Sequence, residues 1–248
     1  MRQLTEPRAL PLYIALEGVK GSGKSTLLAQ LTAHLQSRGV EVIQLCPTRP
    51  APWWTWLELA ARLPSLRGSD ALMERLYAAR STHAARGAAR ALLRAGAPSQ
   101  TARPVVILGD RSFYTSLVTR WERAERLGEG AHWERTRALE PHIPIPDVVI
   151  YLDLPLDQLL SRLRRRARGY GQRDETAERL IAARAAYERL ISSDHGARSQ
   201  WVRLSGESPT LSQDACALLD RLAASATHKT PHTPPHTPPH TPPHRQKP

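Results

Sequence analysis

A short glycine-rich segment near the N-terminus constrains the fold more than any other feature of the sequence. An apolar run at 12–16 precedes it, and leucines at helical spacing follow it over 24–38. Glycines let successive backbone N–H groups point inward, and a helix N-terminus adds partial positive charge, so a strand, such a loop and a helix together bind phosphate. The segment therefore predicts an α/β fold with a nucleoside triphosphate at 18–26. Its residues are Gly18, Val19, Lys20, Gly21, Ser22, Gly23, Lys24, Ser25 and Thr26.

Two side chains of this loop carry the chemistry that we expect there. Lys24 is expected to reach the β- and γ-phosphates, and the Ser25 hydroxyl is expected to be a ligand of Mg²⁺. Such loops serve kinases, GTPases and motor ATPases alike, so the loop predicts a ligand and leaves the reaction open.

Short apolar runs alternate with longer helical patterns along the chain. Alternation of this kind indicates a parallel sheet covered by helices on both faces. We therefore expect a three-layer fold around a five-stranded parallel sheet. The expected strands are 12–16, 40–45, 104–108, 147–152 and 201–204, and the expected helices are 24–38, 51–62, 70–95, 112–127, 156–167, 175–191 and 212–223.

Composition bounds the domain organisation and the partners. The net charge of +12 favours anionic partners, and the two cysteines give no disulfide framework. No stretch approaches the roughly 20 apolar residues that a membrane span needs, so we expect a cytoplasmic protein without membrane contact. Residues 227–248 repeat His-Thr-Pro-Pro units, which predicts a disordered tail after a single domain at 1–226.

Charged residues follow the expected strands at their exits. Arg49 comes shortly after the second strand, and Asp110 and Arg111 come directly after the third. Because ligands gather beyond the carboxyl ends of parallel strands, Arg111 could clamp a phosphate in bidentate fashion and Asp110 could hold Mg²⁺ or accept a proton. The alternative is that Asp110 caps the next helix and Arg111 is a surface residue.

An arginine-rich stretch lies after the fourth strand. It includes Arg168 and Arg173, with two glycines between them. A basic segment at about 164–175 that closes over a triphosphate would stabilise negative charge in the transition state and exclude water, so we expect a lid there. The alternatives are a solvated basic face and a nucleic-acid patch.

The order of these motifs resembles that of the thymidylate kinase family of nucleotide kinases. The likeness runs from about residue 12 to residue 222. The matching segments are Leu16-Glu17-Gly18, Gly23-Lys24-Ser25-Thr26, Leu76-Tyr77-Ala78-Ala79-Arg80, Asp110-Arg111-Ser112 with Thr115-Ser116, Tyr151-Leu152-Asp153 and Gln172-Arg173-Asp174-Glu175.

The resemblance implies roles for residues at matching positions. Lys24 and Ser25 would bind ATP and Mg²⁺, Arg111 would clamp the acceptor monophosphate, and Asp110 would support the metal. Glu17, Arg49, Arg80 and Ser116 would lie on the acceptor side, and the lid arginines would assist the transfer. The implied reaction is phosphoryl transfer from ATP to dTMP or a related nucleotide, giving the diphosphate and ADP.

The chain departs from the family pattern at several acceptor-side positions. Lys20 stands where the family commonly has aspartate, and Arg80 falls one residue short of the family spacing. Thr119 and Arg120 stand where the family has Tyr-Gln near the base. The departures concern recognition of the acceptor and leave the donor half intact.

Two other functions stay open at this point. Deoxynucleoside kinases also have an acid-Arg-Ser segment. They use an acid after the second strand as the catalytic base. In this chain Glu17 could take the place of that base only if the Glu17 side chain faces the acceptor. An ATP-binding protein associated with nucleic acid, or a nucleotide sensor, would explain the positive charge. We expect nucleotide substrates rather than nucleic acid as partners, and a homodimer remains open.

Overall fold

The chain folds around a five-stranded parallel sheet in a computed structural model that describes residues 11–48, 70–95, 103–165 and 175–228. The strand order is β2-β3-β1-β4-β5, so β1 lies at the centre, between β3 and β4. The strands are β1 (Leu12–Glu17), β2 (Glu41–Leu45), β3 (Val105–Asp110), β4 (Val148–Asp153) and β5 (Gln200–Ser205).

Apolar side chains on both faces of the central strands explain why the sheet is internal. In β1, Ile14 and Leu16 pack on one side, while Tyr13 and Ala15 pack on the other, and all four are buried. Strands covered on both faces read as continuous apolar runs, and this is the pattern in β1, β3 and β4. Glu17 ends β1 on the same face as Tyr13 because side chains alternate along a strand.

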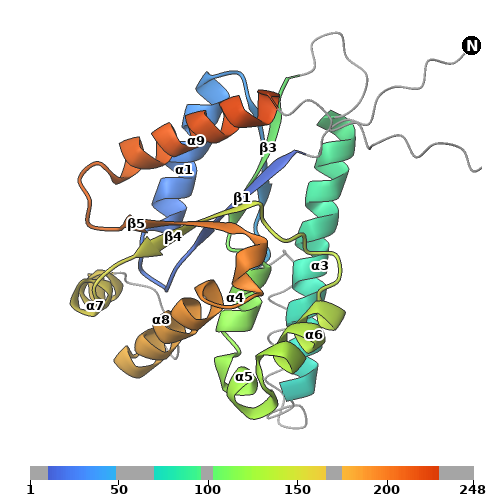
Figure 1. Ribbon diagram of the computed structural model, residues 1–248, viewed down its shortest axis with the longest axis vertical. Coiled ribbons are helices and arrows are strands. Elements are labelled where there is room, and N and C mark those ends of the chain that lie inside the picture. Colours follow the sequence, from blue (N-terminus) through green and yellow to red (C-terminus); the bar gives the residue numbers. More distant parts are fainter. Residues whose placement is uncertain (1–10, 49–69, 96–102, 166–174, 229–248) are drawn as a thin grey trace, which may run out of the picture.

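Helices cover both faces of this sheet (Figure 1). On one face, α1 and α9 pack against the first core cluster. The other face carries α3, α4 and α8, with α5 and α6 outside them. The helices are α1 (Lys24–Ser37), α3 (Asp70–Ala95), α4 (Phe113–Val118), α5 (Trp121–Leu127), α6 (Glu129–Leu139), α7 (Leu156–Arg165), α8 (Ala177–Ile191) and α9 (Leu211–His228), with a 3₁₀ turn, η2 (Gly196–Arg198).

The five expected strands and the three-layer architecture are confirmed, and so is the helix at 70–95. The single helix expected at 112–127 is wrong, since the chain forms α4 and α5 with a break at 119–120. At the break, the Arg120 amide donates to the Leu117 carbonyl, three residues back, at 3.3 Å, so the α-helical pairing stops there. The helix α6 was not expected from the sequence, and the expected helix at 51–62 and the tail at 229–248 lie outside the described residues.

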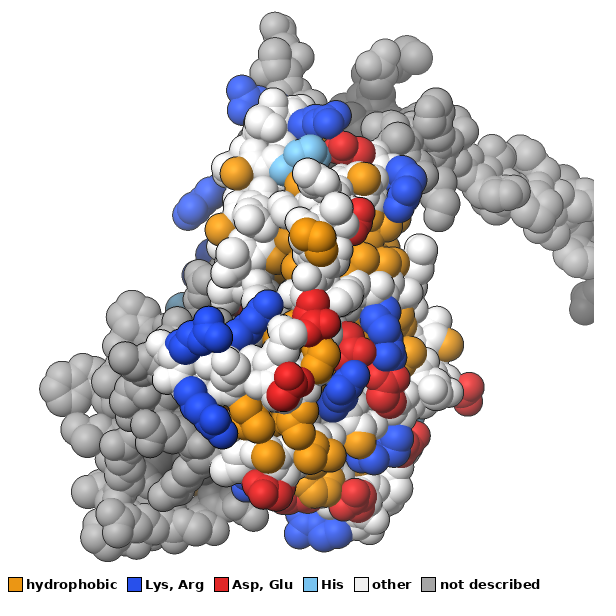
Figure 2. All heavy atoms as spheres, turned by 90° about the vertical axis from the view of Figure 1, so that its left-hand side faces the viewer, with side chains coloured by type: hydrophobic (Ala, Val, Ile, Leu, Met, Phe, Trp, Pro, Cys, Tyr) orange, Lys and Arg blue, Asp and Glu red, His pale blue; other side chains and the backbone are white. Residues whose placement is uncertain are grey.

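Charges of both signs share the surface. Figure 2 shows one face of the molecule, where acidic and basic side chains are interspersed among small apolar patches. Some of these charges form ion pairs that link separate elements. Asp153 of β4, for example, lies 2.9 Å from Arg184 of α8 and 3.2 Å from Arg203 of β5. Among the helices of the described segments, none is both long and apolar enough to cross a membrane.

Candidate active site

The glycine-rich loop lies between the end of β1 and the start of α1, as expected. Gly18, Gly21 and Gly23 have φ angles of 137°, 93° and 100°, a region that side-chain-bearing residues rarely adopt. A Cβ on Gly18 would lie 2.6 Å from the Leu152 carbonyl oxygen of β4, so the loop can pass this strand only with glycine there. The loop geometry therefore depends on the glycines that the sequence pattern singled out.

The ammonium group of Lys24 lies within the loop. Its Nζ donates to the carbonyl oxygens of Gly18 at 2.9 Å and Val19 at 2.8 Å, and to Ser22 Oγ at 3.2 Å. Lys24 is buried, whereas Ser25 in the same first turn of α1 is exposed. The loop thus combines a held positive charge with a solvent-facing hydroxyl.

The end of β3 brings Asp110 and Arg111 beside this loop. Asp110 is in register with Leu16 of β1, and the Arg111 amide donates to the Leu16 carbonyl at 3.1 Å. Ser112 caps α4 by accepting from the Tyr114 amide, so the alternative in which Asp110 is the cap is wrong. Arg111 has a φ of 73°, which makes it the one non-glycine residue of the described segments with a positive φ.

Glu17 is the centre of a buried hydrogen-bond network. One carboxylate oxygen accepts from the Ser112 amide at 2.8 Å and the Ser112 hydroxyl at 2.7 Å. The other accepts from Thr115 Oγ1 and the Tyr187 hydroxyl, both at 2.7 Å. Burial raises the pKa of Tyr187, and the nearby Glu17 charge raises it further, so the phenol keeps the proton it donates. Glu17 is fully buried, and both of its carboxylate oxygens accept hydrogen bonds from the protein.

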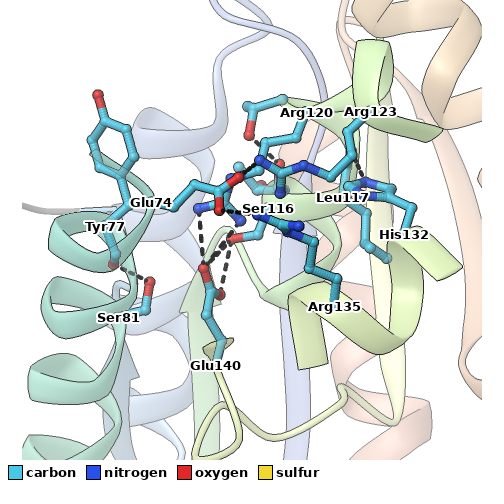
Figure 3. Close-up of polar contacts among 12 residues, drawn as sticks. Glu74, Tyr77, Ser81, Ser116, Leu117, Arg120, Arg123, His132, Arg135 and Glu140 are labelled. Atoms are coloured by element: carbon cyan, nitrogen blue, oxygen red, sulfur yellow. Dashed lines mark hydrogen bonds and ion pairs between the residues drawn. The ribbon is translucent and has the colours of Figure 1, made fainter. Parts of the chain in front are cut away.

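A second buried carboxylate, Glu140, lies beyond α6 (Figure 3). Ser116 Oγ lies 2.9 Å from both of its oxygens, and Arg120 Nη1 lies 3.4 Å from one of them. Burial raises the pKa of Glu140, while the charges of Arg120 and Arg80 oppose that rise. Glu140 therefore interacts with two residues that the sequence assigned to the acceptor side, Arg80 and Ser116. No local sequence motif marks this acid.

Comparison with known proteins identifies the family. A model of the thymidylate kinase family matches residues 16–214. The thymidylate kinase of Xanthomonas campestris pv. campestris (strain B100) is 30% identical over 224 residues, which make up 88% of this chain and 88% of that protein. This chain belongs to the thymidylate kinase family. The probable thymidylate kinase of Thermococcus kodakarensis is 30% identical over 160 residues, covering 62% of this chain and 72% of that relative.

Membership of the thymidylate kinase family makes the chain a nucleotide kinase, a phosphotransferase. The matched region includes the end of β1, the other four strands, the buried acids Glu17 and Glu140, and the stretch expected to form the lid. A nucleoside kinase and a nucleic-acid-associated ATP-binding protein are both disfavoured by this match.

The main departure from the thymidylate kinase pattern, Lys20, has a partner in the structure. Its Nζ lies 2.8 Å from a Glu175 carboxylate oxygen, and both side chains are partly exposed. Glu175 is the last residue of the stretch expected to form the lid. The lysine is therefore part of an ion pair between the phosphate loop and the approach to α8.

Some sequence predictions for the site lie outside the described residues, and one residue near the loop was missed. Arg49, Arg168 and Arg173 lie outside them. Arg162 of α7 donates to the Gly206 carbonyl at 3.0 Å, and a Cβ on Gly23 would lie 3.6 Å from its Nη1. The sequence could not distinguish Arg162 from its basic neighbours because only the fold brings α7 next to the phosphate loop.

Proposed function

We propose that the chain transfers the γ-phosphoryl group of ATP to dTMP, giving dTDP and ADP. The bond between the γ-phosphorus and the bridging oxygen of ADP breaks, and a bond from that phosphorus to a phosphate oxygen of dTMP forms. The observation that carries the proposal is the adjacency of the phosphate loop and the Asp110–Arg111 pair on neighbouring strands. The family match supports the choice of acceptor.

The donor half of the site rests on the loop at 18–26. Its backbone N–H groups and the N-terminus of α1 favour the negative charge of a triphosphate. Lys24 would exchange its carbonyl partners for β- and γ-phosphate oxygens, because its three donors suit either set. The buried position of the ammonium makes its interaction with a phosphate stronger than it would be in water.

The donor set near the loop fits a magnesium ion held jointly with the nucleotide. In the described part of the chain, no three His, Cys, Asp or Glu side chains gather as a protein-only metal site. Mg²⁺ typically keeps several waters and binds through one or two protein groups plus substrate phosphates. Ser25, exposed at the start of α1, and Asp110, at the end of β3, would supply those protein groups, and the ion would neutralise charge on the transferring phosphates.

The acceptor half rests on Arg111 and the network beneath it. Arg111 Nη1 lies 3.4 Å from Thr115 Oγ1, and that hydroxyl donates to Glu17. We therefore assign Glu17 a positioning role, in which it orients Thr115 and so the guanidinium that binds the acceptor phosphate. Arg80 and Ser116 remain candidates for contact with the nucleoside of the acceptor. Arg49 remains a candidate for binding the acceptor, and Arg168 and Arg173 remain candidates for stabilising the transition state.

An acceptor panel tests the proposal. Release of ADP is measured with ATP–Mg²⁺ and each of dTMP, dUMP, dCMP, dAMP, dGMP and the corresponding nucleosides. We expect dTMP to give the highest kcat/KM. Turnover stimulated only by nucleosides would identify a nucleoside kinase, and no stimulation by any monophosphate would refute the proposal.

Lys24→Ala tests the donor half separately. Loss of one group that stabilises transition-state charge lowers kcat by about 10²–10³-fold, and we expect at least that loss here. The control is the thermal unfolding curve, which must show a folded variant. A folded Lys24→Ala protein with wild-type kcat would show that this loop does not bind the donor phosphates.

A further inference from the structure

The two acid clusters on the α3–α6 side differ in what they contact (Figure 3). Glu74 of α3 forms ion pairs with Arg123 and with Arg135, the latter at 3.2 Å. Glu140 instead holds a hydroxyl and a guanidinium, those of Ser116 and Arg120. Both acids are buried, and Glu140 contacts Ser116, which the proposed function assigns to the acceptor side.

Burial of a carboxylate at this position has a cost that the fold must offset. Glu140 has no exposed surface, and removal of an ionised carboxylate from water costs several kcal/mol after relaxation. The Ser116 and Arg120 donors and the nearby charge of Arg80 act against that cost. These three residues come from α4, the α4–α5 connection and α3, so Glu140 joins elements that are separate in sequence.

The contact with Glu140 determines what the Ser116 hydroxyl can offer to a ligand. A serine hydroxyl has one proton and two lone pairs. With both carboxylate oxygens 2.9 Å away, the proton is donated to Glu140. The lone pairs are what remain, so Ser116 can accept a hydrogen bond from a ligand but cannot donate one.

We propose that Glu140 is a positioning residue for acceptor specificity, which fixes Ser116 as a hydrogen-bond acceptor and so selects bases that present a ring N–H. Thymine and uracil carry a proton on N3, whereas cytosine presents a lone pair there. The inference rests on the proposed function, because it takes Ser116 to face the base of the acceptor. It assigns part of the discrimination between dTMP and dCMP to a residue that does not touch either nucleotide.

Glu140→Gln replaces one of the two carboxylate acceptors of the Ser116 proton with a donor and removes the charge of the other. Arg120 donors lie at the Oε1 position, so the amide oxygen should stay there and the NH₂ group should face Ser116. Ser116 then accepts from the amide NH₂, and its own proton has only the neutral amide oxygen at the Oε1 position as a protein acceptor. That bond is weaker than one to a carboxylate, so the proton can turn to the N3 lone pair of cytosine. The ratio of kcat/KM for dTMP to that for dCMP should fall at least tenfold through acceptor KM, while KM for ATP stays within twofold.

Glu74→Gln is the matched control. It changes an equally buried acid in the same region without touching Ser116. We expect it to lower the unfolding temperature and to leave the dTMP/dCMP ratio within twofold of wild type. A tenfold fall of the dTMP/dCMP ratio in this control would show that the ratio responds to any destabilisation of the fold, and it would overturn the proposal.

A double-mutant cycle with Ser116→Ala completes the test. If Glu140 acts through Ser116, Glu140→Gln should leave the ratio unchanged in the Ser116→Ala background. A folded Glu140→Gln protein with the wild-type ratio, or the same fall in both backgrounds, would overturn the proposal. If Glu140→Gln does not fold, Ser116→Ala alone decides, since it should lower the ratio and an unchanged ratio refutes the proposal. Failure of the wild type to phosphorylate dTMP would instead refute the proposed function.

Discussion

At the scale of single residues, Arg111 shows how the site uses a strained position. Its φ of 73° lies in the left-handed region, where a side chain costs of order 1–3 kcal/mol. The same residue is tied to β1 through the Leu16 carbonyl and to α4 through Thr115. A glycine would satisfy the backbone, so the arginine side chain must be there for another reason, and binding of the acceptor phosphate is the reason that we propose.

Substitution of Arg111 should separate function from backbone strain. Arg111→Gly and Arg111→Ala both lack the guanidinium, so both should raise acceptor KM and lower kcat to a similar extent. Arg111→Gly should be more stable than Arg111→Ala by about 1 kcal/mol, because glycine adopts positive φ without a Cβ penalty. Urea unfolding and steady-state kinetics measure the two effects. An alanine variant as stable as the glycine variant would contradict the strain argument.

Among the secondary-structure elements, Glu17 joins three parts of the chain at one buried point. The acid ends β1, its partners Ser112 and Thr115 belong to the start of α4, and Tyr187 comes from α8. Hydrogen bonds to an ionised acceptor are stronger than neutral ones. The network therefore fixes how α4 and α8 pack against the strand that leads into the phosphate loop.

Glu17→Gln should weaken this junction. Neutral bonds would replace charge-assisted ones, and we expect the free energy of unfolding to fall by about 2 kcal/mol. Tyr187→Phe, which removes one donor, should cost about 1 kcal/mol. Because the two residues share a hydrogen bond, their effects in the double variant should couple by at least roughly 0.5 kcal/mol. Strict additivity in urea unfolding would show that the network does not act as a unit.

The packing of α6 on α4 should depend on pH through His132. Its Nε2 lies 3.1 Å from the Leu117 carbonyl, and burial lowers the pKa of the imidazole below its usual 6.5, with Arg123 and Arg120 lowering it further. As pH falls through 6.5, the unfolded chain takes up a proton that the folded chain refuses, so stability present above pH 6.5 is lost below it.

His132→Gln tests this pH dependence, since its amide can still donate to the same carbonyl. The free energy of unfolding of the wild type should fall more steeply than that of the variant between pH 6.5 and the lower folded pKa. Urea unfolding at several pH values measures the difference between the two stability profiles. The other nine histidines are present in both proteins, so their contributions cancel in that difference. Parallel pH profiles would contradict the argument.

The sequence predicted elements well where the pattern was local and less well where partners are distant. Glycines and apolar runs marked β1, the phosphate loop and α1, and the alternation of elements predicted the parallel sheet. The break between α4 and α5 was missed, and so was the helix α6. The helix α6 lacks a continuous apolar face and buries only a few residues, Trp133 among them, so no apolar pattern marks it. Glu140 could not be found from sequence, since its partners lie 20 or more positions away.

At the scale of the whole molecule, the net charge of +12 does not produce a single basic surface on the face that Figure 2 shows, where acidic and basic side chains are interspersed. Several arginines are instead committed to acids within the fold, as in the pairs of Asp153 and Glu74. The family match at 16–214 covers most of this folded region. Charge therefore serves the internal network and the nucleotide site, in agreement with a kinase acting on anionic small molecules.

The most direct test of this account is product analysis after mixing the protein with ATP labelled at the γ-phosphate, Mg²⁺ and dTMP. The account predicts that the label appears in dTDP, one for each ADP formed, and that Lys24→Ala and Arg111→Ala each reduce this transfer by about 10²-fold or more. Label released only as inorganic phosphate, or transferred to thymidine but not to dTMP, would contradict it.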